Sequence, residues 1–293
     1  MPHQSNFQGA LLGLAGMGLF ACADIVIKLL GGNYNPFQII FFAGIMTFPL
    51  IAGLLIADAS VNNLRPRLPK LMALRCGVVL LNGILGTYAF ATLPLAQCYA
   101  IFFTMPIFIA LLSVPILGEK IDVARGIAVV AGLIGVTVAL DPGKAVLEWG
   151  HAAALIGAMV GALNYIILRK TGSTERTAVL LLYPLIGQVV VAAVALPLVY
   201  RPMPLQDLAL TALMATVTFA GYLLIIAAYR RAPGIVVAPM QYSQIIWAAI
   251  FGAMLFNEQM SARVWIGTVV IILAGLVIVT RRDRAVEIAP THP

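Results

Sequence analysis

The chain has 293 residues, of which 62% are hydrophobic and only 10% are charged, and its mean hydropathy is +1.02. A soluble protein carries roughly 25% charged residues, so this chain has too few charges to cover a surface in water. The net charge of +7 comes from Lys and Arg residues that stand in short clusters between apolar runs. This pattern is typical of polytopic membrane proteins. We therefore predict a protein whose partner is the lipid bilayer and which binds no nucleic acid.

Ten apolar runs follow one another along the chain, separated by short connections rich in Pro, Gly, Asn and charge. A helix of about 20 apolar residues is long enough to cross a hydrocarbon core of roughly 30 Å. The runs therefore predict an all-α integral membrane fold with ten transmembrane helices. We place these helices at residues 8–30, 36–57, 70–91, 95–115, 123–140, 150–169, 178–199, 206–229, 235–256 and 263–280.

An internal repeat organises these runs. Pro94 and Glu119 stand 25 residues apart, and the same pair recurs at the same spacing as Pro233 and Glu258. A repeat of about half the chain implies two units of five helices each. Because five is odd, the second unit enters the membrane in the opposite orientation, which is an inverted repeat.

The two predicted units cover residues 1–141 and 142–293. Equivalent connections in the two units differ in their content of Lys and Arg, as inversion requires. If both termini are cytoplasmic, 14 of the 18 basic residues fall on the cytoplasmic side. We therefore predict that both termini, including a short C-terminal tail, lie in the cytoplasm.

The ten runs, the repeat and the Pro and Glu pairs, which end in Gly118-Glu119 and Asn257-Glu258, resemble the EamA-type branch of the drug/metabolite transporter superfamily. The resemblance covers essentially the whole chain, and within that branch the sequence is similar to aromatic amino acid exporters. It implies a carrier of the bacterial inner membrane with a central cavity between its two halves, which works by alternating access. One position departs from the repeat, because Asn257 stands where the first half has Gly118, and this predicts a turn of different geometry.

Sequence and resemblance together predict a secondary transporter that exports small metabolites, most simply aromatic or other neutral amino acids. The alternative is an exporter of drugs or other neutral metabolites with the same fold, and a remote alternative is a membrane-embedded enzyme. No phosphate-binding GxxxxGK[ST] motif and no cluster of metal-ligand residues occurs in the sequence. We therefore expect no catalytic residue, no metal, no cofactor and a monomer that binds a small-molecule substrate.

The ninth run contains the richest set of polar side chains. Gln241, Gln244 and Trp247 recur every three residues, so they share one inclined face of a helix, and Tyr242 lies beside them. The equivalent part of the fourth run is aromatic and includes Phe103. We predict that these walls form part of a pocket for a small amphipathic solute. The alternative is packing between helices, with the Gln side chains as polar contacts.

Further polar and aromatic residues within the predicted helices are candidate substrate contacts, because polar side chains are costly in a bilayer unless they face a cavity or a partner. The alternative for each is helix packing or an interfacial aromatic belt. These candidates are Asn82, Tyr88, Tyr99, Asn164 and Tyr222.

Asp24 is the acidic residue that lies well inside an apolar run. As a hypothesis, it is a proton site that couples transport to the pH gradient. It also stands four residues before Lys28, so the alternative is a structural ion pair on one helix face. Glu119 and Glu258 stand at predicted corners and are expected to cap or shape turns, and Pro106 and Pro239 are expected to act as hinges or ordinary kinks.

Overall fold

A computed structural model describes residues 2–57, 64–118, 123–140, 148–171, 174–175, 177–232 and 234–287. All the secondary structure in these ranges is helical, so the all-α class is confirmed. Glu119, Pro233 and the predicted unit boundary at 141/142 lie outside the described residues. The helices are α1 (Pro2–Gly31), α2 (Pro36–Ala57), α3 (Pro69–Thr92), α4 (Leu95–Phe102), α5 (Met105–Leu117), α6 (Val123–Leu140), α7 (Trp149–Thr171), α8 (Thr177–Val199), α9 (Leu205–Arg231), α10 (Gly234–Val237), the 3-10 helix η1 (Ala238–Ser243), α11 (Gln244–Phe256) and α12 (Ala262–Glu287).

Seven of the helical stretches are both long and apolar enough to cross a membrane. They cover the predicted spans 1, 2, 3, 4, 6, 7 and 8. The remaining predicted spans correspond to three shorter apolar helices, which are Gly126–Ala139, Met240–Phe256 and Ala262–Val277. Nearly all polar backbone groups of such helices bond within the helix, which is why helices suit a hydrocarbon solvent.

Two of the predicted continuous spans are interrupted. The fourth consists of α4 and α5, which are separated at Phe103 and Thr104, directly before Pro106. Proline has no N–H and clashes with the carbonyl four residues earlier, so a regular helix cannot pass through this point undisturbed. The ninth span consists of α10, η1 and α11, and such a stretch of 3-10 helix within a longer helix marks a point where its axis can bend.

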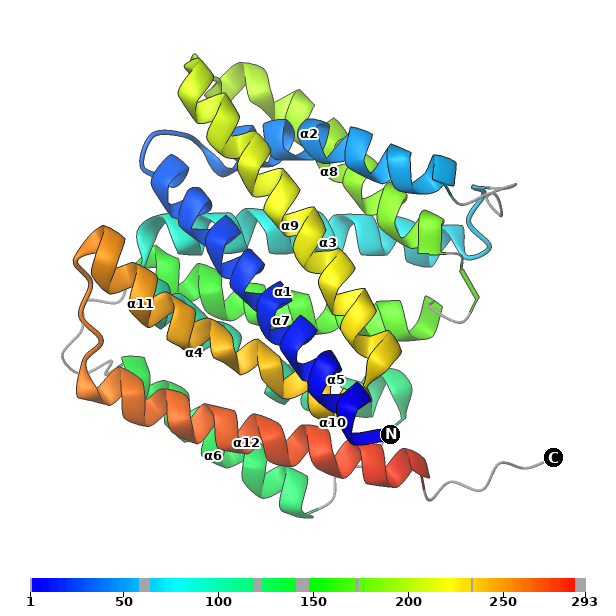
Figure 1. The fold of residues 1–293 in the computed structure, drawn as a ribbon, viewed down its shortest axis with the longest axis vertical. Helices are drawn as coiled ribbons and strands as arrows, with labels where there is room; N and C mark the ends of the chain where they lie inside the picture. The colour runs from blue at the N-terminus through cyan, green and yellow to red at the C-terminus, as the bar shows by residue number, and fades with distance from the viewer. Residues whose placement is uncertain are drawn as a thin grey trace.

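The helices pack in pairs that can be followed from one edge of Figure 1 to the other. α2 packs against α8 along one edge and α6 packs against α12 along the other. Between these edges, α1 packs against α9 and α3 packs against α7, while α4 and α11 contact each other. The start of α1 and the end of α12 lie on the same side of the molecule in Figure 1.

The two corners that follow α5 and α11 have the same backbone geometry. Gly118 has φ +70° and Asn257 has φ 54°, so both residues end their helices in the left-handed conformation. The prediction that Asn257 changes the turn is therefore wrong. Asparagine is one of the few residues other than glycine that tolerates this conformation, because its short side chain is polar and compact.

One end of the molecule is tightly packed around the last turn of α1, and we call it the Lys28 end. A Cβ atom on Gly31 would overlap the Cβ of Ala91 in α3, and a Cβ on Gly150 in α7 would overlap the side chain of Thr92. α1 and α3 thus meet closely. Among the described residues, α7 and α9 make no comparably extensive contact with each other.

Candidate functional site

Lys28 joins three helices at the Lys28 end. Its Nζ lies 2.7 Å from Oε1 of Glu258 and donates a hydrogen bond of 2.5 Å to the carbonyl oxygen of Leu93. The other carboxylate oxygen of Glu258 accepts the backbone N–H of Leu95 at 2.9 Å, so Glu258 caps the start of α4. The Nζ also lies 5.2 Å from the centre of the Phe256 ring. The expected capping role of Glu258 is confirmed, and we call Lys28 and Glu258 the latch.

Asp24 has a different partner from the one that its spacing suggested. It accepts a hydrogen bond from the hydroxyl of Tyr99 in α4. The predicted alternative, an ion pair with Lys28, is wrong because the ammonium group is bound by Glu258 from a distant part of the chain. Asp24 is therefore held by a neutral hydroxyl and has no basic partner among the described residues.

Arg75 is a charged residue that was not among the predicted substrate contacts. The structure places it within α3, two turns after Pro69, with a side chain that is almost completely buried. Its Nε donates to Oδ1 of Asn164 at 3.2 Å, and its Nη1 donates to the carbonyl oxygen of Leu180 at 2.5 Å. The sequence did contain a signal for this position, since Arg75 lies six residues beyond a helix-starting proline inside an apolar run.

Tyr165 and Tyr222 connect these charges. The two residues expose 54% and 56% of their surface. The ring of Tyr222 meets that of Phe20 in α1 edge to face, with 5.0 Å between the ring centres. Tyr222 is close enough to interact electrostatically with Tyr165, Asp24 and Arg75. The structure thus gathers one acid, one base and two phenols from four helices. We call Asp24, Arg75, Asn164, Tyr165 and Tyr222 the inner cluster.

The three residues of the predicted amide-rich face lie at the junction of η1 and α11. Gln241 belongs to η1, whereas Gln244 begins α11. Trp247 packs against α1, since a Cβ on Gly18 would lie 3.4 Å from the indole. The indole Nε1 is buried and has no hydrogen-bond partner within the described part of the protein. A buried donor without a partner is costly, so this group is a natural contact for a bound solute.

The predicted aromatic wall is a buried column. Phe103 lies 6.1 Å from Tyr99 and 5.1 Å from Tyr242 between ring centres. All three side chains are buried, and the hydroxyl of Tyr242 packs directly against Gly275 of α12. The hydroxyl of Tyr242, like the indole N–H of Trp247, is buried without a hydrogen-bond partner among the described residues.

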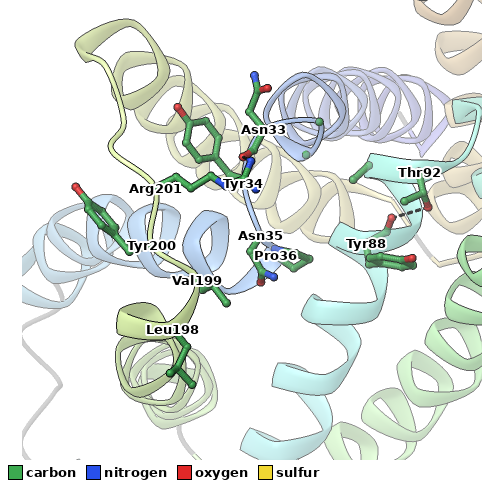
Figure 2. Close-up of a pocket in the computed structure, with 13 residues that line it drawn as sticks. Asn33, Tyr34, Asn35, Pro36, Tyr88, Thr92, Leu198, Val199, Tyr200 and Arg201 are labelled. Carbon is green, nitrogen blue, oxygen red and sulfur yellow. Dashed lines mark hydrogen bonds between the residues drawn. The ribbon is translucent and has the colours of Figure 1, made fainter.

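The remaining predicted contacts, Asn82 and Tyr88, are separated along α3. Asn82 faces α7, where its Oδ1 would lie 3.2 Å from a Cβ on Gly161. Tyr88 is partly exposed and lines a different space near the Lys28 end, together with Thr92, whose hydroxyl donates to the Tyr88 carbonyl at 2.8 Å (Figure 2). Asn82 lies beside the helix that carries Asn164, whereas Tyr88 lies apart from the inner cluster.

This second space is an open cavity of about 520 Å³ at the Lys28 end. The α1–α2 turn, the end of α3 and the α8–α9 connection surround it, as Figure 2 shows. The sequence analysis did not find it, because its lining comes from connections far apart in the chain. The lining residues are Gly31, Gly32, Asn33, Tyr34, Asn35, Pro36, Tyr88, Ala91, Thr92, Leu198, Val199, Tyr200 and Arg201.

Hydrogen bonds hold the two connections around this cavity together. The buried amide of Gln38 donates to the backbone carbonyl of Arg201 at 2.6 Å and accepts the backbone N–H of the same residue at 2.8 Å. The hydroxyl of Tyr34 donates to Asp207 at 2.5 Å. This hydrogen bond, followed by burial and the nearby negative charge, raises the pKa of Tyr34 above its ordinary value. The cavity is thus framed by a rigid rim.

Metal chemistry has no support in the part of the chain that the structure describes, since no three His, Cys, Asp or Glu side chains gather there as potential ligands. The free thiols Cys22, Cys76 and Cys98 are far apart in the sequence, and Cys98 is completely buried.

Comparisons with known proteins give a consistent result. The EamA-like transporter family matches residues 7–140 and, again, residues 148–280. The chain is 27% identical over 273 residues to the S-adenosylmethionine uptake transporter of Rickettsia prowazekii, covering 90% of each protein. It is 24% identical over 284 residues to the pseudopaline exporter CntI of Pseudomonas aeruginosa, covering 91% of this chain and 94% of the exporter. A crystal structure that is 17% identical superposes with a TM-score of 0.62 over 95% of this chain and 98% of the other, which supports the fold.

Proposed function

Because the chain belongs to the EamA-like transporter family, and is thus a multi-pass membrane transporter rather than an enzyme, we propose that it carries small amphipathic metabolites across the bacterial inner membrane by alternating access. The observation that carries this proposal is the inner cluster. Ionisable side chains within membrane-spanning helices are costly unless they face a cavity or a partner, and they commonly mark a transport pathway. Here Asp24, Tyr165 and Tyr222 present polar surface between apolar helices.

We propose ten spans arranged as two inverted repeats, 1–141 and 142–293, around a central site, with both termini in the cytoplasm. Two separate matches to the same family support the division. The pairing of helices supports the inversion. In the proposed repeats α1 corresponds to α7 and α3 corresponds to α9, so the α1–α9 pair and the α3–α7 pair are equivalent. The interrupted fourth and ninth spans also occupy equivalent places.

The solute that we propose is an amino acid, aromatic or otherwise neutral, or a metabolite built from one. Export is the proposed direction, and in the proposed topology the Lys28 end faces away from the cytoplasm. One relative is named for uptake and another for export, so the direction belongs to each carrier rather than to the family. S-adenosylmethionine, which is an amino acid derivative, is amphipathic and charged, and this favours the proposal over an exporter of uncharged drugs.

The binding site that we propose lies where α1 meets the interrupted spans. Trp247 supplies an unpartnered N–H beside Gly18, and Gln241 and Gln244 supply amides at the adjoining 3-10 helix. Irregular backbone within a membrane protein is tolerated where it lines a cavity or is enclosed by protein. The column of Tyr99, Phe103 and Tyr242 supports this wall from behind.

Counterflow of labelled amino acids in proteoliposomes tests the proposal. Purified protein is reconstituted with an excess of unlabelled solute inside, and entry of labelled aromatic, aliphatic and hydroxylated amino acids and of S-adenosylmethionine is measured. We expect saturable exchange by the wild type. Gln244→Ala and Trp247→Ala should each raise KM about tenfold, since a lost buried hydrogen bond costs about 1–3 kcal/mol.

Trp265→Ala is the matched control, because Trp265 is partly exposed on α12. Unchanged KM in all three variants would move the site elsewhere, whereas the absence of exchange of every tested solute by the wild type would refute the proposed substrate class.

A further inference from the structure

Arg75 has an unusual position for a cation in a membrane protein. It lies within α3, and its side chain is buried against α7 and α8. No carboxylate pairs with it in the described part of the chain, because both of its hydrogen bonds go to neutral oxygens. A buried charge without a counterion is unfavourable. Its presence in an apolar helix therefore calls for an explanation beyond helix packing.

The orientation of the guanidinium is fixed by its two partners. Nε is bound by the Asn164 side chain and Nη1 by the Leu180 carbonyl. Nη2 makes no hydrogen bond to the described residues, and it is not among the fully buried atoms that lack partners, so part of its surface remains accessible. The planar guanidinium suits a carboxylate, which can accept two parallel hydrogen bonds from it. Arg75 is thus held in place and still has donors to offer.

Asp24 supplies an opposite charge near the same tyrosine. Tyr222 is close enough to interact electrostatically with both Arg75 and Asp24, and it exposes more than half of its surface. Its ring centre lies 5.0 Å from that of Phe20, which stands one helical turn before Asp24 in α1. Asp24 is bound by the neutral hydroxyl of Tyr99 and has no cation beside it. An unpaired base and an unpaired acid therefore lie near one tyrosine, and an aromatic face attracts cations.

We propose that Arg75 is the residue that recognises the carboxylate of the carried solute, with Asp24 and the faces of Tyr165 and Tyr222 receiving its cationic part. This inference rests on the proposed function and deepens it. The solute class is amphoteric, meaning that one molecule carries both a carboxylate and an ammonium or sulfonium group. In a solute of this kind, the carboxylate is the counterion of Arg75 and the cationic group is the counterion of Asp24.

The test compares ligands that differ only in the carboxylate. Binding of L-phenylalanine and L-phenylalaninamide, and of L-methionine and L-methioninamide, is measured by thermal shift of the purified protein and by inhibition of counterflow. The wild type should prefer each acid to its amide by about tenfold or more, because a charge-assisted hydrogen bond is lost with the carboxylate. In Arg75→Gln this preference should disappear, while affinity for the amides is retained.

Two further variants separate recognition from a purely structural role. Arg75→Lys keeps the charge and should restore part of the preference. Lys70→Gln removes the same charge from the exposed start of the same helix and should leave the preference intact. If Arg75 only ties α3 to α7 and α8, Arg75→Gln will weaken acids and amides equally, which would overturn the assignment.

The possible results also distinguish the inference from the function on which it rests. A wild type that exchanges amino acids but binds acids and amides equally would overturn the inference and leave the carrier function intact. Retention of the acid preference in Arg75→Gln would overturn it as well. A wild type that binds none of these solutes would refute the proposed function and the role of Arg75 with it.

Discussion

At the Lys28 end, α1 and α3 meet closely at Gly31 and Ala91, whereas α7 and α9, which hold the equivalent places in the proposed second repeat, have no comparably extensive contact in the described ranges. The two halves share a pattern but differ in their packing. If both pairs packed alike, the inner cluster would be sealed from both sides or open to both. In the alternating-access cycle that we propose, unequal packing of the equivalent helices opens the inner cluster to one side at a time, and exchanging the two arrangements reverses the access.

Some helix contacts are expected to persist during transport and others to break. α1 packs extensively on α9, and α3 packs extensively on α7, so each pair is expected to move as one body. The latch and the Gly31 contact join α1 to elements outside its own pair. These contacts are therefore the ones that must break when the Lys28 end opens.

Removing the latch should have the largest effect on this asymmetry. Lys28→Met leaves Glu258 without its cation, and the side chains of the pair expose only 13% and 17% of their surface. Breaking such a pair costs about 2–4 kcal/mol, which is a shift of about 30-fold or more toward the open Lys28 end. Cys98 is a native reporter, because it is fully buried beside this end and donates to the carbonyl of Ala89.

The measurement is the rate of maleimide labelling of Cys98 in a Cys22→Ser/Cys76→Ser background. Lys28→Arg keeps the charge and is the control, with labelling close to that of the parent. Equal protection of Cys98 in Lys28→Met and the parent would show that the latch does not hold this end closed.

A steric change at the same end should have the next largest effect. In Gly31→Leu the new side chain would collide with Ala91, and overpacking of this kind costs about 1–3 kcal/mol. We expect counterflow to fall about tenfold, because a carrier that cannot close one end cannot complete its cycle. Gly32→Leu is the matched control, since a Cβ at Gly32 would meet no atom within 4 Å. Equal counterflow in the two variants would remove the α1–α3 contact from the mechanism.

Most of the helix positions were predictable from the sequence because they depend on local composition. The predicted run 70–91 agrees with α3 to within one residue at both ends. The interruptions at Phe103 and within 238–243 could not be located, because a proline in an apolar run is compatible with a continuous kinked helix as well as with a broken one.

The partners of the charged side chains were not predictable, because they depend on contacts between distant segments. Spacing alone favoured Asp24 as the partner of Lys28, yet Glu258 reaches the same ammonium from more than 200 residues away. The contacts of Arg75 were not predictable for the same reason, since its partners Asn164 and Leu180 belong to other helices. The proposal that Arg75 and Asp24 bind an amphoteric solute therefore needed the three-dimensional arrangement of the helices.

Asp24 offers a smaller and more specific test, because it lies one helical turn from Lys28 but outside the latch. If it carries the coupled proton, Asp24→Asn should remove the difference between accumulation with and without a pH gradient, in addition to any loss of exchange from its proposed contact with the cationic part of the solute. With one proton per solute and a pH difference of 1, the loss would be up to about tenfold in accumulation. The measurement compares solute accumulation with and without the gradient in the same proteoliposomes.

The hydroxyl of Tyr99, which binds Asp24, provides the control. Tyr99→Phe removes that hydrogen bond but keeps the carboxylate, so gradient dependence should persist. Undiminished gradient-driven accumulation in Asp24→Asn would exclude Asp24 as the coupling site.

The smallest effects are expected at Gly118 and Asn257, the two left-handed residues that end α5 and α11. Substitutions at these two positions should nevertheless have different consequences. Replacing either Gly118 or Asn257 with alanine puts a Cβ into a left-handed conformation and should cost about 1 kcal/mol of stability. The consequences should differ, because Asn257 directly precedes Glu258 of the latch. Asn257→Ala should therefore also speed the labelling of Cys98 several-fold, whereas Gly118→Ala should lower the unfolding temperature alone. Asn257→Gly keeps the corner and should do neither, and equal labelling in the two alanine variants would mean that the corner does not position the latch.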